Sequence, residues 1–223
     1  MDVFQNPLAD FTGPDACLND PFVFTDNSIA YSTGLSNWSW DFDGTGNSAS
    51  QNPTHSFPSS GSYNVELIVE DLKGCKDTIE KSINVLPLPV VDFMADLLKA
   101  CAPMTVSFTD MSNDALSWDW DLGDTYNTSS YTSQNPTHTY TQPGLYTVTL
   151  TVTSSIGCSN SFTNNNMLEV YDNPIADFIP VPDKTSLADA IFNFNNTSVN
   201  GDTWMWDFGD GNTSSDESPV HIY

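Results

Sequence analysis

Hydrophobic and polar residues alternate with a period of two along several short segments of the chain. Trp38, Trp40 and Phe42 alternate with polar residues, and the same alternation runs through 63–70 and 146–153. Because successive side chains of a strand point to opposite faces, this pattern predicts half-buried β-strands. Glycines flank these segments at positions typical of turns, and no segment shows helical periodicity. The chain is therefore predicted to be all-β and built from antiparallel β-sandwiches.

The same pattern occurs three times along the 223 residues. Each copy opens on a Pro-x-x-Asp-Phe segment, continues through a Trp-x-Trp-Asp segment, and reaches a His two residues after a Pro. The three His residues are spaced 83 residues apart, at His55, His138 and His221. This period is too long for a solenoid and is typical of a string of small domains. The sequence therefore predicts three units, at 1–88, 89–173 and 174–223.

The third unit is predicted to be truncated before its last strands. In the first two units the His is followed by a Gly-x-Tyr-x-Val-x-Leu-x-Val strand and a Gly-Cys turn, whereas the sequence ends at Tyr223. The third unit also has no cysteine after its first strand. A sandwich without its last strands leaves a sheet edge and an apolar face open. Two explanations stay open: a fragment of a longer array, or a strand donated by another chain.

The four cysteines occupy two repeated positions. Cys17 and Cys101 follow the first strand of their units, and Cys75 and Cys158 follow the Gly of the late hairpin. If equivalent cysteines pair alike within a unit, the disulfides are Cys17–Cys75 and Cys101–Cys158. A zinc site is the rival interpretation, but no two cysteines have the spacing of zinc ligands. Disulfides predict an oxidising, extracellular location.

The charge of the chain excludes some partners. There are 29 acidic residues against five Lys and no Arg, which gives a formal net charge of −24. Binding to nucleic acid needs a Lys/Arg surface that displaces counterions from phosphate, and an anionic membrane would repel this chain. No apolar run reaches the ~18 residues of a membrane-spanning helix. The aromatic content of 12% argues against a disordered acidic chain.

Three short motifs resemble the PKD (polycystic kidney disease) domain family. Residues 206–211 read Trp-Asp-Phe-Gly-Asp-Gly, residues 135–140 read Asn-Pro-Thr-His-Thr-Tyr, and residues 144–152 read Gly-x-Tyr-x-Val-x-Leu-x-Val. The first unit carries weaker copies in the same order. The cysteines and the Gly-Cys turn resemble PKD repeats of large cell-surface proteins of Bacteroidota, including adhesins linked to gliding motility and type IX secretion.

The resemblance implies a fold and a role. The fold is an immunoglobulin-like sandwich of about seven strands in each unit. The role is that of a non-catalytic, secreted spacer and adhesion module, which holds other domains away from a cell surface. Its partners would be protein or glycan surface ligands and the neighbouring domains of a longer chain. The alternative is a polysaccharide-binding accessory module of a secreted polymer-degrading enzyme.

Close pairs of Asp residues are the candidate catalytic groups, but their positions are more typical of turn residues. The pairs are Asp41 with Asp43, Asp119 with Asp121, and Asp207 with Asp210. On an outward strand face, without a cleft, such carboxylates have neither a raised pKa nor a site that excludes water. Asp side chains in such places bond local backbone N–H groups. No catalytic residue and no enzymatic activity are therefore expected.

The remaining candidates are a metal site and a contact surface. Some PKD domains bind calcium, which makes Asp202, Asp207 and Asp210 the best place for it here, although the loops lack the dense oxygen ligands that calcium prefers. No other cofactor is expected, and the three His residues are interpreted as structural. Loops often carry the contacts to ligands or protein partners. The candidate contact residues are therefore the tyrosines in loops that differ between units, Tyr31, Tyr126 and Tyr131.

Overall fold

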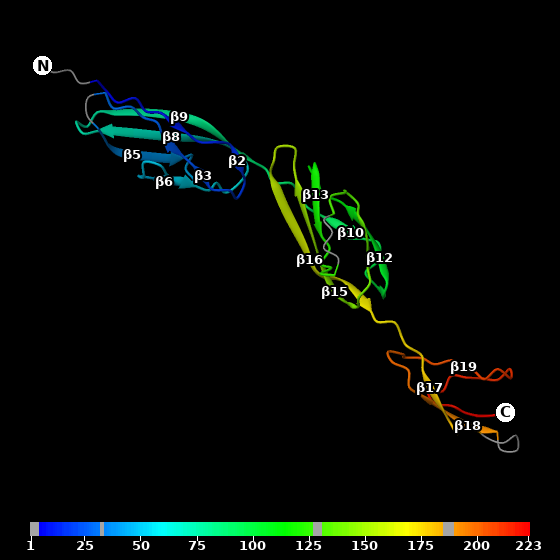
Figure 1. Cartoon of the computed structure of the whole chain (residues 1–223). Coiled ribbons are helices and arrows are strands. Elements are labelled where there is room, and N and C mark those ends of the chain that lie inside the picture. Colours follow the sequence, from blue (N-terminus) through cyan, green and yellow to red (C-terminus); the bar gives the residue numbers. More distant parts are fainter. Residues whose placement is uncertain (1–4, 32–33, 127–130, 185–189) are drawn as a thin grey trace.

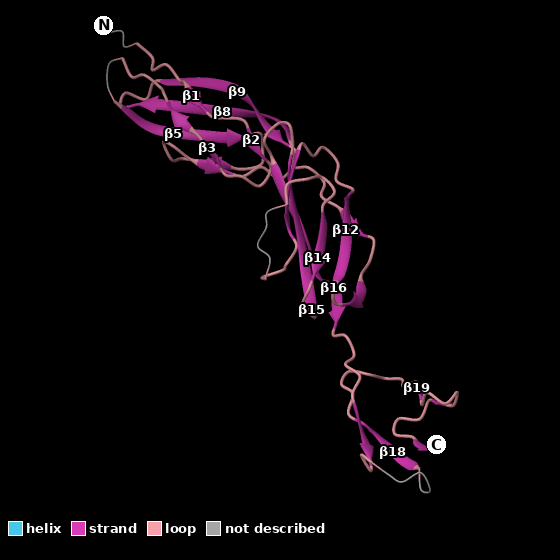
Figure 2. Cartoon of the chain, turned by 45° about the vertical axis from the view of Figure 1, so that its right-hand side comes forward, coloured by secondary structure: helices cyan, strands magenta, loops and turns pink. Residues whose placement is uncertain are grey.

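The computed structural model describes residues 5–31, 34–126, 131–184 and 190–223, which form β-strands joined by turns and loops (Figure 1). The chain forms three units that follow one another end to end, with the N-terminus and the C-terminus at opposite ends of the molecule (Figures 1 and 2). Among the described residues there is no helix of the length and hydrophobicity that a membrane crossing needs.

The first unit packs a five-stranded sheet, in the order β2-β9-β8-β5-β6, against two short strand pairs, β1-β4 and β3-β7. All neighbours are antiparallel except β2, which runs parallel to the end of β9 and places Cys17 opposite Leu86. The strands are β1 (Phe11–Thr12), β2 (Ala16–Cys17), β3 (Phe22–Val23), β4 (Thr25–Asp26), β5 (Leu35–Phe42), β6 (Asn47–Ser48), β7 (Thr54–His55), β8 (Gly61–Asp71) and β9 (Lys76–Leu86).

The second unit repeats this arrangement with a four-stranded sheet, β11-β16-β15-β13, over a three-stranded sheet, β10-β12-β14. Here β11 runs parallel to the end of β16 and places Cys101 opposite Tyr171. The strands are β10 (Phe93–Ala95), β11 (Lys99–Cys101), β12 (Met104–Asp110), β13 (Ser117–Asp121), β14 (Thr137–Tyr140), β15 (Gly144–Thr153) and β16 (Ser159–Tyr171).

The third unit has the three-stranded sheet β17-β18-β21 and, opposite it, only the strand pair β19-β20 in its described residues (Figure 2). The strands are β17 (Phe178–Val181), β18 (Ile191–Asn196), β19 (Trp206–Asp207), β20 (Thr213–Ser214) and β21 (Val220–Ile222).

A core of aromatic and branched side chains lies between the two sheets of each complete unit. The second Trp of each Trp-x-Trp segment is almost fully buried, with 1% of Trp40 and 2% of Trp120 exposed. The ring of the opening Phe meets this Trp edge to face, at 5.1 Å for Phe11 and Trp40 and 5.2 Å for Phe93 and Trp120. This geometry is favourable for aromatic pairs, and it confirms the core face that the alternation predicts.

The hairpin strands lie beside the Trp strand in the same sheet and extend that wall of the core. Their alternate residues, fully buried in both complete units, are Val65, Leu67 and Val69 of β8 and Val148, Leu150 and Val152 of β15. The polar residues between them face outward, where Thr149, Thr151 and Thr153 bond across to hydroxyls of β16. The predicted all-β fold of tandem immunoglobulin-like sandwiches is therefore confirmed.

Candidate functional site

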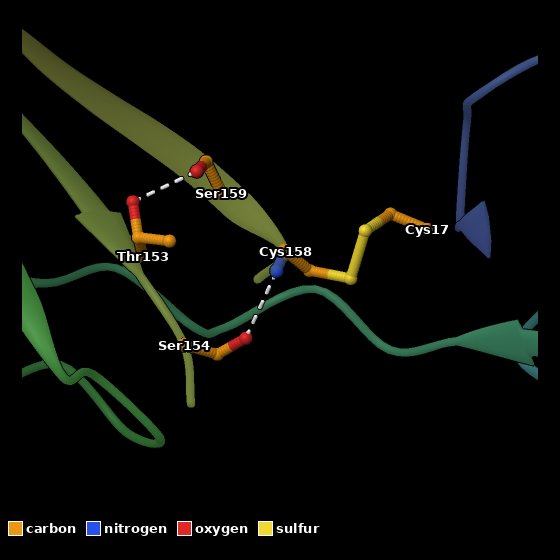
Figure 3. The surroundings of a disulfide bond; sticks show 5 residues. All are labelled: Cys17, Thr153, Ser154, Cys158 and Ser159. Atoms are coloured by element: carbon orange, nitrogen blue, oxygen red, sulfur yellow. Dashed lines mark hydrogen bonds between the residues drawn. A yellow bond between two sulfur atoms is a disulfide. The ribbon is translucent and has the colours of Figure 1, made fainter. Parts of the chain in front are cut away.

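A disulfide joins the first unit to the second. Cys17, at the end of β2, is bonded to Cys158, which lies immediately before β16, with an S–S distance of 2.04 Å and a Cα–Cα distance of 5.6 Å (Figure 3). The bond links residues 141 apart in sequence. It crosses the junction between two sandwiches, so it fixes one unit against the next rather than closing a loop within a unit.

The predicted pairs Cys17–Cys75 and Cys101–Cys158 are wrong in this structure, where Cys75 and Cys101 are free thiols. The reason is the length of the last strand. Cys75 directly precedes β9, whereas Cys17 lies opposite its last residue. About ten residues at ~3.3 Å each place these two cysteines roughly 30 Å apart, and a disulfide needs Cα atoms within ~7 Å.

The same strand geometry explains why the disulfide forms between units. The early cysteine of each unit lies beside the end of the last strand, where the chain leaves for the next unit. The Gly-Cys turn lies at the start of that strand, where the chain has entered from the unit before. The exit end of one unit therefore meets the entry end of the next, and this brings Cys17 to Cys158.

The turn that holds Cys158 is tightly bonded. Its amide nitrogen donates to Ser154 Oγ at 3.2 Å, its carbonyl accepts from Ser154 N at 2.8 Å, and the side chain is fully buried (Figure 3). Asn160 Nδ2 donates to the carbonyl of Pro89 at 2.9 Å, which ties the hairpin to the segment between the units. Around the disulfide lies a shallow depression of about 500 Å³.

A second recurring feature is a His side chain bonded to the turn after the Trp strand. In the second unit His138 Nε2 lies 2.9 Å from Asp124 Oδ2, and its Nδ1 lies 2.7 Å from the Tyr131 hydroxyl. Both the His138 and Asp124 side chains are at least 96% buried. In the third unit His221 lies 2.9 Å from Asp210, and in the first His55 lies 2.9 Å from Thr45 Oγ1.

The hydrogen bond between His138 and Asp124 depends on the glycine of the Leu-Gly-Asp turn. Gly123 has φ +72°, and a Cβ there would lie 2.4 Å from the carbonyl oxygen of Thr147. Only glycine fits this conformation and this close approach, and the turn aims Asp124 at His138. The predicted structural role of the His residues fits these contacts, which are hydrogen bonds to side chains of the turn.

Four of the six paired Asp residues bond their own turns. Of the other two, Asp119 is exposed on β13, and Asp43 accepts a hydrogen bond from Asn64 N of β8 at 3.4 Å. Oδ1 of Asp41, Asp121 and Asp207 accepts a hydrogen bond from the N–H of a following glycine, at 2.8–2.9 Å. Asp210 accepts from the backbone and side chain of Asn212, and these bonds, with that of His221, lower the pKa of its carboxyl to about 2. These four carboxylates are engaged as the sequence predicts for turns.

The three carboxylates singled out for calcium do not gather into a metal site. Asp207 and Asp210 bond their own turn, whereas Asp202 lines a separate depression at the second junction. Within the described part of the chain, no group of three or more His, Cys, Asp or Glu side chains could hold a metal ion. Calcium binding stays an untested prediction.

The candidate contact tyrosines differ in exposure. Tyr126 is 77% exposed and Tyr31 is 50% exposed, so both rings are available to a partner. Tyr131 is half-buried and packs against His138 with its hydroxyl engaged, so it supports the core of the second unit. The rest of the loop between Tyr126 and Tyr131, residues 127–130, lies outside the described residues.

Comparison with known proteins identifies the family. The model of the PKD domain matches residues 4–86 and again residues 87–170. The chain belongs to the PKD domain family. This PKD chain is 27% identical to the PKD1 domain of Vibrio anguillarum Epp over 38% of its length and 99% of that domain, with a TM-score of 0.36.

Two further solved structures are similar to parts of this PKD chain. The PKD1 domain of the Vibrio cholerae metalloprotease PrtV is 30% identical, over 37% of this chain and 99% of that one, with a TM-score of 0.35. A structure described as carbohydrate-binding modules of the β-sandwich superfamily is 18% identical, over 68% of this chain and 56% of that one, with a TM-score of 0.37.

We expect Asp124→Ala to destabilise the second unit by about 1–3 kcal/mol, because it leaves Nε2 of the buried His138 without a hydrogen-bond partner. Asp119→Ala, on the exposed face of β13, is the matched control and should change stability by less than about 0.5 kcal/mol. Urea unfolding followed by the fluorescence of Trp residues measures both. Equal effects of the two substitutions would show that the hydrogen bond between His138 and Asp124 does not stabilise the second unit.

We also expect the first unit to lose stability in mild acid through His55. Burial against Phe42 lowers the pKa of this His, so the folded state favours the neutral ring. The stabilisation is therefore complete above the unfolded pKa of about 6.5 and is lost as the pH falls through the lower folded value. NMR titration of the ring should give a pKa below that of a free His. A value at or above it would refute the assignment, and His55→Gln should remove this part of the pH dependence.

Proposed function

We propose that this PKD array is a non-catalytic extracellular spacer and adhesion stalk of a larger cell-surface protein, stiffened by disulfides between consecutive domains. The observation that carries the proposal is the Cys17–Cys158 bond, because it joins two folded units that need no such bond to complete their own cores. A covalent bond across a junction restricts bending and twisting there. That property serves a stalk rather than a catalyst.

The junctions contain little free chain. Leu86 accepts a bond from Leu18 N at 2.8 Å, and only Pro87 and Leu88 follow before the opening segment of the second unit at Pro89. At the second junction Tyr171 accepts from Ala102 N at 2.9 Å, and Asn173 Nδ2 donates to the Ala102 carbonyl. Proline and these bonds restrict the connecting residues, which supports a semi-rigid array.

The surface and the cysteines suit an extracellular setting. Disulfides persist in oxidising compartments, and PKD domains are typically extracellular. The net charge of −24 keeps such an array soluble and discourages self-association. The role in gliding motility or type IX secretion that the resemblance implies belongs to this proposal and rests on the resemblance alone.

Protein or glycan contacts are the second part of the proposal. The exposed ring of Tyr126 is the best-placed contact residue, since 77% of its surface is free. If the chain is instead a polysaccharide-binding accessory module, binding to insoluble glycans should be strong in the natural chain and lost in Tyr126→Ala. Leu116→Ala, a change at an exposed apolar side chain of the same unit that is not a candidate contact residue, is the control.

The stalk predicts an extended particle whose shape depends on one disulfide. Small-angle X-ray scattering should give a radius of gyration well above the about 17 Å of a compact domain of this length. Replacing both Cys17 and Cys158 by Ser should broaden the distance distribution, because the first junction is then free to bend. Replacing Cys75 and Cys101 by Ser should leave it unchanged. A compact particle, or equal effects of the two double variants, would contradict the proposal.

A further inference from the structure

The third unit has the same aromatic core as the first two, but one face of it is uncovered. Phe178 meets Trp206 edge to face at 5.3 Å, as its counterparts do in the other units. Phe178 is nevertheless 49% exposed, against 0% for Phe11 and 6% for Phe93. Beside it lies a hollow of about 400 Å³ lined by Phe178, Trp204, Trp206 and neighbouring residues.

The first two units show what covers this face. There the Trp strand pairs with the first strand of the late hairpin, placing Trp40 opposite Leu67 and Trp120 opposite Leu150. In the third unit β19 pairs with β20 on one side, and no other strand of the described residues pairs with it. The open edge of β19 and the apolar hollow together fit a β-hairpin with an alternating apolar face.

A buried polar atom at this face also lacks a partner. Trp38 and Trp118 donate through Nε1 to Oδ2 of Asp26 and Asp110, at 2.7 Å in both units. Asn196 stands at this place in the third unit, and its Oδ1 is already taken by Ser198 N. Trp204 Nε1 is therefore buried without an acceptor among the described residues. Buried donors are nearly always paired, so this unpaired indole nitrogen sets the face of the third unit apart from those of the first two.

A free cysteine stands where the turn of that hairpin would lie. Cys101 holds the place in the second unit that Cys17 holds in the first, opposite the end of the last strand. It is exposed, and it lines a depression with Tyr171, Pro174 and residues 200–202 of the third unit. The equivalent depression at the first junction is lined by Cys17 and by the Gly-Cys turn of the second unit.

We propose that the open face of the third unit binds a β-hairpin of this repeat's own type, and that Cys101 forms a disulfide with the cysteine of its Gly-Cys turn. The occupant has the sequence chemistry of residues 142–172: alternating Tyr, Val and Leu residues, then a Gly-Cys turn. A disulfide then joins the consecutive units at every junction. In each case it links the early cysteine of one unit to the cysteine of the hairpin turn in the next. The inference concerns a binding site and stands apart from the mechanical role proposed above.

The disulfide forms by exchange with a small-molecule disulfide such as oxidised glutathione. One cysteine, as thiolate, attacks the oxidant and releases one reduced glutathione. The other cysteine then attacks this mixed disulfide and releases the second. Both thiol protons end on the two glutathione molecules, and the two electrons reduce the oxidant.

The test mixes the natural chain with a synthetic peptide of the sequence 142–172 in a glutathione redox buffer. Mass spectrometry of a non-reducing digest should find the peptide on Cys101. Docking raises the local concentration of the turn cysteine, so capture should be at least about tenfold faster at Cys101 than at Cys75. The matched control peptide carries Val148→Asn and Leu150→Asn, which keep the cysteine and remove the apolar face. It should lose the preference for Cys101.

Two further variants separate docking from thiol chemistry. Cys101→Ser should abolish covalent capture but retain binding of a fluorescent peptide, measured by anisotropy. Because a free hairpin peptide can fail to fold, the same sequence is also fused after Tyr223 through a flexible linker. Oxidation of that chain should bond Cys101 to the added cysteine.

Three results would overturn the proposal. The first is equal capture at Cys75 and Cys101, or equal capture of the two peptides. The second is a fused chain whose Cys101 stays reduced in the oxidising buffer. The third is a Cys75–Cys101 bond between two chains, which would make a second copy the occupant. A bent particle in scattering would refute the stalk and leave these results unaffected.

Discussion

The length of the last strand in each unit is the constraint on which the arrangement of this chain depends. β9 and β16 run from one end of their sandwich to the other, so each strand separates an entry end from an exit end. The early strand pairs in parallel with the exit end, and the hairpin turn lies at the entry end. Cysteines at these two positions are too far apart to meet within one unit. They meet only across a junction.

The core of each unit depends on a smaller set of contacts that recurs almost unchanged. A Phe meets a Trp edge to face at 5.1, 5.2 and 5.3 Å in the three units. The indole nitrogen of that Trp donates to a backbone carbonyl in the following turn in every unit, at 2.8–3.1 Å. The third unit keeps these contacts, although no strand of its described residues takes the place beside β19 that β8 and β15 take beside the Trp strands of the other units.

Much of the fold could be predicted from the sequence because its signals are local. The alternation around Trp40 and Trp120 gives the strands and the core face, and the motifs of 135–152 and 206–211 give the family. The unit boundaries at 88 and 173 stay a prediction. The role of Asp124 was missed, although its place after Leu122-Gly123 in a motif shared with Asp207-Phe208-Gly209-Asp210 was a usable signal.

The disulfide pairing could not be predicted, since it depends on which strand ends lie together. Repetition requires equivalent cysteines to pair alike, but pairing within units and pairing between successive units both meet that requirement. Only the parallel contact of β2 with the end of β9 decides between them, and a two-residue strand gives almost no sequence signal.

The most direct test of a chain joined across its junctions is to map its disulfide under non-reducing conditions. The protein is alkylated without reductant, digested and analysed by mass spectrometry, so that bonded cysteines appear as linked peptides. The account predicts one linked pair, Cys17 with Cys158, and alkylated Cys75 and Cys101. Linked pairs of Cys17 with Cys75 and of Cys101 with Cys158 would contradict it.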